Sequence, residues 1–334
     1  MTGKRDAASG EERIIDRLFR PIAKHPAALG LQDDAAMLAP PVGHDLVLTV
    51  DAIVSGVHFL PDDSADTIAK KALRVNLSDL AAKGAAPLGA LLSLSMPENT
   101  GNDWLELFAR GLAEDCSLFE CPLLGGDITR TPGALTISIT ALGSVPTGKM
   151  VQRKGARAGD VVVVTGTVGD AALGLKLRRS PDNAALAKLD QRAKEHLRHR
   201  YLLPMPRLAL AAAVRNHASA AMDVSDGLAG DLAKLAAVSG VRAMIDAASL
   251  PLSTAARAAI EGDGGLIETV LTGGDDYEIV ACIPENRLPA FRAAAAGVQV
   301  EVTTIGRIEA GEGMTVIGPN GQPMKLKQAS FSHF

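Results

Sequence analysis

The spacing of apolar residues along the chain predicts an alternation of helices and strands. Ile14, Leu18 and Ile22 recur at helical intervals and share one face, so we expect a helix over residues 11–23. Strand-forming residues run without interruption through 45–50, which predicts a strand. The helical pattern returns over 66–86, 102–119 and the basic segment around His196 and His199. Further strands are expected over 88–96, 134–145, 161–165, 241–246, 298–308 and 314–317.

One stretch, residues 49–59, joins a strand to side chains that can bind a ligand. Asp51 follows the run 45–50, and Gly56 and His58 come after it. A carboxylate that closes an apolar strand is expected to have a partner, and a loop after a strand is where α/β folds usually place chemistry. The alternative is a strand that surfaces and turns without any ligand.

The acidic strand end recurs, and the recurrence favours a site. Asp127 follows a short apolar strand and two glycines, and Gly-Gly-Asp returns at 273–275. Glycines have no side chain, so backbone N–H groups can approach a phosphate there. The aspartate can bind the metal ion that accompanies the phosphate. Asp223 ends another short strand, and Ser225 and Asp226 can cap the helix that follows. Taken singly, each of these motifs could be a polar turn or an ordinary capped helix.

Polar residues also interrupt the helix expected over 66–86. Asn76, Ser78 and Asp79 prefer helix ends to helix interiors, which suggests a site, with a solvated helix face as the alternative. The acidic candidates at strand ends, caps and turns are Asp33, Asp51, Asp79, Asp127, Asp223 and Asp226. Neither histidine nor cysteine accompanies them at ligand spacing, and oxygen-only ligands favour Mg²⁺, which normally arrives with phosphates. The sequence therefore predicts phosphoryl transfer at a Mg²⁺ cluster, without a P-loop.

Length and composition limit the number of domains and the classes of protein to which the chain can belong. A chain of 334 residues is too long for one ordinary core, so we expect two domains, 1–148 and 149–334, with the boundary in the Gly-rich basic segment 146–160. Aromatic residues are 3% and the net charge is −4, which argues against a nucleic-acid binder. The polar segment 1–13 and the lack of an apolar run of about 18 residues predict a cytoplasmic protein without a membrane span.

The ordered motifs resemble those of the thiamine-monophosphate kinases, in the superfamily of aminoimidazole ribonucleotide synthetase and selenophosphate synthetase. The resemblance runs from about Asp33 to the C-terminus and rests on DDAAML, TVDAIVSGVHF, KALRVNLSDLAAKGA, GGDITR, DVSDGL, GGDDYE and the terminal aromatic-x-His-Phe. It implies an α/β (α+β) fold in which 1–148 binds ATP and Mg²⁺ and forms a homodimer through its sheet, and 149–334 is the second α/β domain. It implies direct, in-line transfer of the γ-phosphoryl group of ATP to thiamine monophosphate, the last step to thiamine diphosphate. A general base is not expected, because the acceptor phosphate is already an anion.

The resemblance also implies roles for single residues. Mg²⁺ ligands are implied at Asp33, Thr49, Val50, Asp51, Asp79, Asp127, Asp223 and Asp226. ATP contacts are implied at Gly126, Asp127, Arg153 and Ser225. Contacts to thiamine monophosphate are implied at His58, Asp275 and Phe331. Gln32 stands where glycine is usual, Val50 where threonine is common, and Asp275 where relatives also carry glutamate. Val50 can therefore offer a metal only its carbonyl oxygen, and Asp275 has a shorter reach.

Two other functions compete with the kinase. Another ATP-dependent enzyme of the superfamily is one, although selenophosphate synthetases carry an N-terminal reactive Cys and no cysteine precedes Cys116 here. The DDYE and His-Phe signatures argue against aminoimidazole ribonucleotide synthetase. A non-catalytic nucleotide or thiamine-phosphate sensor is the other. Such a sensor is expected to have lost metal aspartates, and all of them are present.

Overall fold

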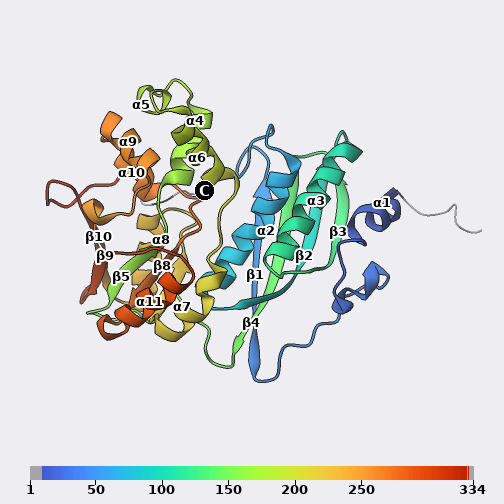
Figure 1. Cartoon of the computed structure of the whole chain (residues 1–334), viewed down its shortest axis with the longest axis horizontal. Helices are drawn as coiled ribbons and strands as arrows, with labels where there is room; N and C mark the ends of the chain where they lie inside the picture. The colour runs from blue at the N-terminus through green and yellow to red at the C-terminus, as the bar shows by residue number, and fades with distance from the viewer. Residues whose placement is uncertain (1–9, 329, 331–334) are drawn as a thin grey trace, which may run out of the picture. The chain divides into compact units, whose positions relative to one another are not determined.

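The computed structural model describes residues 10–328 and 330, and the chain divides into two compact units, each with its own sheet (Figure 1). Unit 1 comprises the residues up to 77 and 86–147, and unit 2 comprises 78–85 and the residues from 148 onward. In this described part, none of the helices combines the length and the hydropathy that a membrane span requires.

Unit 1 is built on a four-stranded sheet in the order β1-β4-β2-β3. The strands are β1 (His44–Val54), β2 (Ala86–Pro97), β3 (Leu123–Thr131) and β4 (Thr136–Pro146). β4 is antiparallel to β1 and β2, whereas β2 and β3 are parallel. A parallel pair needs a crossover connection, which the helix α3 (Asn102–Leu118) supplies.

Two long helices, α2 (Ala65–Ala82) and α3, lie side by side on one face of this sheet (Figure 1). A buried ion pair joins them, with Nε of Arg74 2.6 Å from Oδ2 of Asp115. Alternate residues of β4, such as Ile137 and Ile139, are buried because side chains of a strand alternate between its faces. The last residues of α2 belong to unit 2.

The N-terminal part of unit 1 departs from the sequence prediction. The single helix expected over 11–23 is a short helix α1 (Gly10–Ile14) followed by a π-helical turn (Ile15–Phe19). The helical segment ends at Phe19, two residues before Pro21, which has no amide hydrogen with which to continue it. A 3-10 segment, Pro26–Leu31, precedes β1.

Unit 2 is built on a six-stranded sheet in the order β10-β7-β9-β5-β8-β6. The strands are β5 (Val161–Thr165), β6 (Ala220–Asp223), β7 (Arg242–Asp246), β8 (Ile279–Ile283), β9 (Val302–Glu309) and β10 (Gly313–Ile317). Among these described strands, β10 and β7 are the one parallel pair, and the other pairs are antiparallel. Val162 and Val164 of β5 belong to one buried cluster and Val163 to another, so the sheet is buried on both faces.

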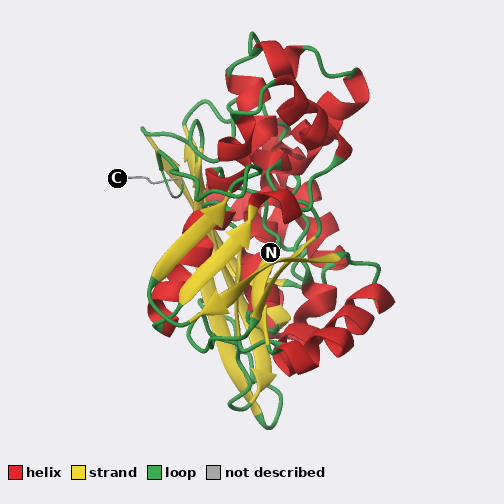
Figure 2. Ribbon diagram, turned by 90° about the vertical axis from the view of Figure 1, so that its left-hand side faces the viewer, coloured by secondary structure: helices red, strands yellow, loops and turns green. Residues whose placement is uncertain are grey.

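Helices flank the strands of unit 2 (Figure 2). They are α4 (Asp170–Arg179), α5 (Ala184–Ala187), α6 (Gln191–Leu202), α7 (Ala211–His217), α8 (Leu228–Ser239), α9 (Thr254–Gly262), α10 (Leu266–Thr272) and α11 (Leu288–Gly297). The face of Val162 packs against α4, α8, α9 and α10, and the face of Val163 packs against α7 and α11. The mixed sheets with their helices confirm the α/β (α+β) class.

Two of the predicted strand ends are wrong. Asp51 and Asp127 lie inside strands, because hydrogen-bonded pairing continues beyond them. β1 pairs with β4 as far as Val54, and β3 pairs with β2 as far as Thr131. Asp223, by contrast, is the last residue of β6, as predicted.

Candidate functional site

β1 carries three of the expected metal ligands, and its pleat separates them. Thr49 and Asp51 share one face of the strand, whereas Val50 points to the other face and is 60% exposed. The N–H of Asp51 donates to Oδ1 of Asn76 in α2 at 3.0 Å, and Nδ2 of Asn76 donates to the carbonyl of Ala72. The buried Asn76 therefore ties α2 to β1 at Asp51, which explains a polar residue inside the helix.

Asp33, Gly126 and Asp127 line the same cavity of unit 1, which has a volume of about 540 Å³. The remaining lining is mostly apolar, so the cavity can accept an apolar ring beside a cation held by carboxylates. A Cβ on Gly126 would collide with the carbonyl oxygen of Leu92 on β2. Glycine is thus required here by the close approach of β2, whether or not a phosphate binds.

His58 is oriented by the backbone around it. Its Nδ1 accepts the N–H of Val54 at 3.1 Å, which leaves Nε2 as the donor nitrogen of the neutral ring. Nζ of Lys71, a residue only 2% exposed, donates to the carbonyl of His58 at 2.8 Å. Phe59, the residue that follows His58, is buried. The ring is therefore placed to offer an N–H to an anionic ligand.

In unit 2, Asp79 of α2 and Asp223 of β6 lie close enough to repel each other. Burial, and then this repulsion, raise the pKa of Asp223 well above its ordinary value, and a hydrogen bond from Ser78 opposes the shift. Nζ of Lys83 donates to the carbonyl of Ala221 at 2.8 Å, and burial lowers the pKa of Lys83 to about 8. The positive charge of Lys83 only partly offsets the burial of Asp223 and its repulsion from Asp79, and a divalent cation would stabilise the two carboxylates further.

Residues 224–227 form a loop that is held by Asp231 of α8. Oδ2 of the buried Asp231 accepts the N–H groups of Ser225 at 3.0 Å and Asp226 at 2.9 Å. Nζ of Lys234 lies 3.0 Å from Oδ1 of Asp231 and 2.5 Å from Oδ2 of Asp226. The predicted capping of α8 by Ser225 and Asp226 is wrong, because α8 begins without a side-chain cap and Asp231 satisfies the loop amides instead.

The segment 273–278 runs beside this loop. The N–H of Asp275 donates to the carbonyl of Ser225 at 2.9 Å, and the N–H of Tyr277 donates to that of Val224 at 2.8 Å. Asp275 (φ 73°) and Tyr277 (φ 52°) both adopt left-handed backbone conformations, which side-chain-bearing residues rarely take. Surrounding contacts must enforce them. The structure thus brings Asp275 next to Ser225.

Arg153 and Phe331 complete the expected contacts. The carbonyl of the exposed Arg153 accepts a hydrogen bond from Oγ of Ser239 at 3.2 Å. Its positive charge is close enough to Lys83 to help lower the pKa of that lysine, so Arg153 lies near the Asp79–Asp223 pair. Phe331 lies outside the described residues.

The expected Mg²⁺ ligands fall in both units. Unit 1 holds Asp33, Thr49, Val50, Asp51 and Asp127, and unit 2 holds Asp79, Asp223 and Asp226. Over residues 10–328 and 330, no group of three or more His, Cys, Asp or Glu side chains converges on one metal position. The donor chemistry in unit 2 still fits a hard cation, because Asp79 and Asp223 supply only oxygens and repel each other. Oδ2 of Asp226 is paired with Nζ of Lys234, so a metal at Asp226 would bind Oδ1 or compete with this ion pair.

Sequence reasoning did not single out Lys83, Asp231, Asp276 and Glu278. Lys83 is buried enough for its pKa to fall, and the other three are almost completely buried. Asp276 and Glu278 belong to the GGDDYE motif, and Asp231 follows DVSDGL closely, so their place in or beside these acidic motifs was the available signal.

Two family models match the chain. The model described as AIR synthase related protein, N-terminal domain, matches residues 32–145, and that described as AIR synthase related protein, C-terminal domain, matches 157–319.

Relatives and solved structures agree with these matches. The thiamine-monophosphate kinase of Caulobacter vibrioides is 45% identical over 309 residues, which cover 90% of this chain and 84% of the relative. The thiamine-monophosphate kinase of Escherichia coli K12 is 38% identical over 330 residues, which cover 98% of this chain and 99% of the relative. A crystal structure of thiamine-monophosphate kinase from Stenotrophomonas maltophilia superposes with a TM-score of 0.82 at 40% identity, covering 94% of this chain and 96% of the other. A structure described as AaThiL complexed with AMPPCP and TMP superposes with a TM-score of 0.77 at 34% identity, covering 89% of this chain and 89% of the other. The chain therefore belongs to the AIR synthase related proteins and, within them, to the thiamine-monophosphate kinases, as its motifs indicate.

Proposed function

We propose that this protein transfers the γ-phosphoryl group of ATP to the phosphate of thiamine monophosphate and so forms thiamine diphosphate. The observation that carries the proposal is its similarity, over most of the chain, to thiamine-monophosphate kinases. The 34% identical structure complexed with AMPPCP and TMP supports it, because those ligands match the two proposed substrates. No residue needs to act as a general base, since the acceptor oxygen already carries negative charge.

We propose that Mg²⁺ ions accompany ATP. The proposed ligands are the carboxylates of Asp33, Asp51, Asp79, Asp127, Asp223 and Asp226, with the hydroxyl of Thr49 and the carbonyl oxygen of Val50 beside Asp51. When bound, such ions neutralise charge between the two polyanionic substrates and on the group in transfer. The repulsion between Asp79 and Asp223 supports this assignment, because a cation would relieve it.

The substrates are assigned to different residues. Gly126, Asp127, Arg153 and Ser225 are proposed to contact ATP. His58, Asp275 and Phe331 are proposed to contact thiamine monophosphate. The Nε2–H of His58 suits a phosphate, and the carboxylate of Asp275 suits the cationic thiamine moiety. In this assignment residues 1–148 bind ATP and Mg²⁺, and 149–334 form the second domain.

Turnover with ATP and Mg²⁺, with and without thiamine monophosphate, tests the proposal. We expect thiamine diphosphate to appear one-for-one with ADP, and only when thiamine monophosphate is present. The Asp127→Asn variant should lower the rate by about 10²-fold or more, because it removes a charged ligand. Asp103→Asn, an exposed residue of α3, is the control and should retain the rate. ADP without diphosphate would favour another enzyme of the superfamily, and binding without turnover would favour a sensor.

We also propose a homodimer, formed through the sheet of unit 1. Leu46, Leu48 and Val50 lie on the face of β1 that α2 and α3 leave open, and they are 40%, 62% and 60% exposed. Apolar residues gathered on an open sheet face mark an interaction surface. A second copy of the chain is the occupant that the family resemblance implies. The cytoplasmic location stays a prediction from the sequence.

A further inference from the structure

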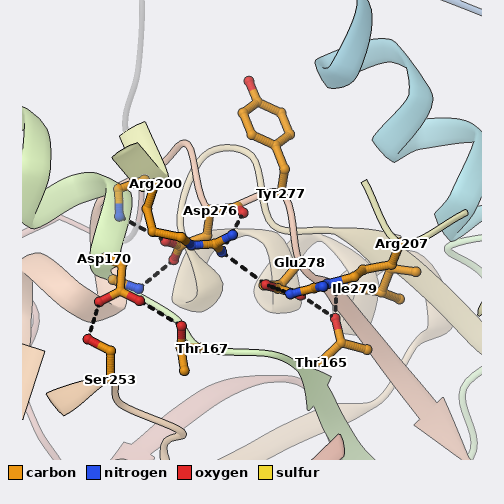
Figure 3. A network of polar contacts seen from close by, with 12 residues as sticks. Thr165, Thr167, Asp170, Arg200, Arg207, Ser253, Asp276, Tyr277, Glu278 and Ile279 are labelled. Atoms are coloured by element: carbon orange, nitrogen blue, oxygen red, sulfur yellow. Dashed lines mark hydrogen bonds and ion pairs between the residues drawn. The ribbon is translucent and has the colours of Figure 1, made fainter. Parts of the chain in front are cut away.

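The segment 273–278 carries three carboxylates with different surroundings. Asp275, which the proposed function places at thiamine monophosphate, is partly exposed. Asp276 and Glu278 are 1% and 0% exposed and enter a polar network of unit 2, whereas the ring of Tyr277 points away from that network (Figure 3). Buried carboxylates are costly without partners, so the contacts of these two residues matter.

Asp276 is bound to the start of α4. Its Oδ2 accepts the N–H of Gly169 at 2.6 Å, and its Oδ1 accepts the N–H of Ala171 at 3.3 Å. Its carbonyl accepts from Nη2 of Arg200 of α6 at 3.4 Å. Two helices therefore hold both the side chain and the backbone of this one residue.

Glu278 is bound by two arginines and a threonine. Arg207 donates from Nε at 2.7 Å and from Nη2 at 2.5 Å, in the two-pronged geometry that fixes a carboxylate most firmly. Nη2 of Arg200 adds a bond of 2.9 Å and Oγ1 of Thr165 one of 2.7 Å. Oγ1 of Thr165 also accepts the N–H of Ile279 at 2.8 Å, so the carboxylate is tied to the first residue of β8.

Asp276 and Glu278 alternate along the chain with Asp275 and Tyr277, the two residues in left-handed conformations. We propose that Asp276 and Glu278 are positioning residues, which hold the segment in the conformation that presents Asp275 to thiamine monophosphate. The inference rests on the proposed function. It adds that substrate affinity depends on two carboxylates that touch neither substrate.

The test compares steady-state kinetics of Asp276→Asn and Glu278→Gln with those of the unaltered chain. We expect KM for thiamine monophosphate to rise about tenfold while KM for ATP changes less than about twofold. Thr165→Val removes one anchor of Glu278 with little change in volume, and it serves if a carboxylate variant does not fold. Asp115→Asn is the matched control, because it breaks a buried arginine–carboxylate pair in unit 1. It should lower the melting temperature without raising that KM.

Amide hydrogen exchange gives a readout that does not depend on turnover. The N–H groups of Asp275 and Tyr277 should exchange faster in Glu278→Gln, because their bonds to Ser225 and Val224 loosen. Folded variants with an unchanged KM for thiamine monophosphate would overturn the proposal, as would an equal rise of that KM in Asp115→Asn. If the unaltered chain forms no thiamine diphosphate, the proposed function fails. Unchanged exchange in the variants would then refute the positioning role separately.

Discussion

At the scale of single residues, buried aspartate carboxylates have two different roles in this protein: one supports the structure, and the other is a candidate metal ligand. Burial raises the pKa of Asp231, but Lys234 and backbone N–H groups oppose this shift, and these contacts tie the carboxylate to its loop. Asp223 is buried beside Asp79, and both effects raise its pKa. A carboxylate in such surroundings costs stability and is typical of a functional site. Contacts, rather than residue type, therefore separate the structural aspartates from the candidate ligands.

Replacing Asp223 by Asn tests this distinction. Without Mg²⁺, near pH 8, the variant should be more stable than the unaltered chain by about 1–2 kcal/mol, because an amide is neither charged nor repelled by Asp79. Its rate of thiamine diphosphate formation should fall by about 10²-fold, because a proposed metal ligand is lost. Thermal unfolding in a chelating buffer and turnover in Mg²⁺ measure the two effects. A less stable variant would contradict the assignment.

Asp276 makes stability depend on pH. Burial raises its pKa to about 8, against the attraction of Arg200 and with a further contribution from Asp170. An aspartate of the unfolded chain titrates near about 4, so between these values the unfolded chain binds fewer protons. The contribution of Asp276 to the free energy of unfolding therefore falls as pH rises from about 4 to about 8.

Urea unfolding across that pH window, with and without Asp276→Asn, measures this contribution. The asparagine does not titrate, so the difference in unfolding free energy between the two proteins should grow in favour of the variant as pH rises. The other titrating groups are common to both proteins and cancel in the difference. A difference that is independent of pH would show that Asp276 keeps an ordinary pKa.

At the scale of elements, the periodicity of the sequence predicted helices and strands well and their functional ends less well. Residues 161–165 are β5 as expected, and α3 ends at Leu118, within a residue of the expected end. Asp51 and Asp127 nevertheless lie inside longer strands. The local pattern of apolar residues indicates which residues prefer a strand. The length of the strand also depends on how far the neighbouring strand continues to pair with it.

The two glycines that flank α8 give a prediction at this scale. Gly227 has φ +120°, and a Cβ there would lie 2.6 Å from the backbone carbon of Thr272. Gly227→Ala should cost about 2–4 kcal/mol, because strain and a backbone collision add. Gly240 has φ +66° and open space around it, so Gly240→Ala should cost roughly 1 kcal/mol. Chemical denaturation of both variants checks the order, and equal losses would show that the contact with Thr272 is unimportant.

At the scale of the whole molecule, the open face of the unit 1 sheet is the feature that a single chain does not explain. Leu46, Leu48 and Val50 alternate with residues on the covered face, so the exposure follows from the pleat of β1 and not from a disordered loop. Side chains of this kind are ordinarily buried, and a second copy would bury them. Assembly is thus expected to be part of the folded state.

Leu48→Glu should convert the proposed dimer into a monomer, because it places a charge in the centre of the apolar surface. Sedimentation equilibrium of the variant and the unaltered chain measures the mass directly. Leu118→Glu is the matched control, because Leu118 is 63% exposed at the end of α3, and this variant should keep the mass of the unaltered chain. A Leu48→Glu variant that keeps the dimer mass would place the interface elsewhere, and a monomeric unaltered chain would refute the dimer.

The sequence by itself determined the family, the class of reaction and the acidic motifs, because short motifs in a fixed order and apolar periodicity are local properties of the chain. Only the tertiary structure decided which of the motif residues meet. It brought Asp79 of α2 to Asp223, paired the 273–278 segment with the loop of Ser225, and turned Asp276 and Glu278 inward to helices and arginines. Such contacts join residues far apart in the chain, and they depend on strand register, burial and hydrogen-bond geometry, which no single stretch of sequence contains.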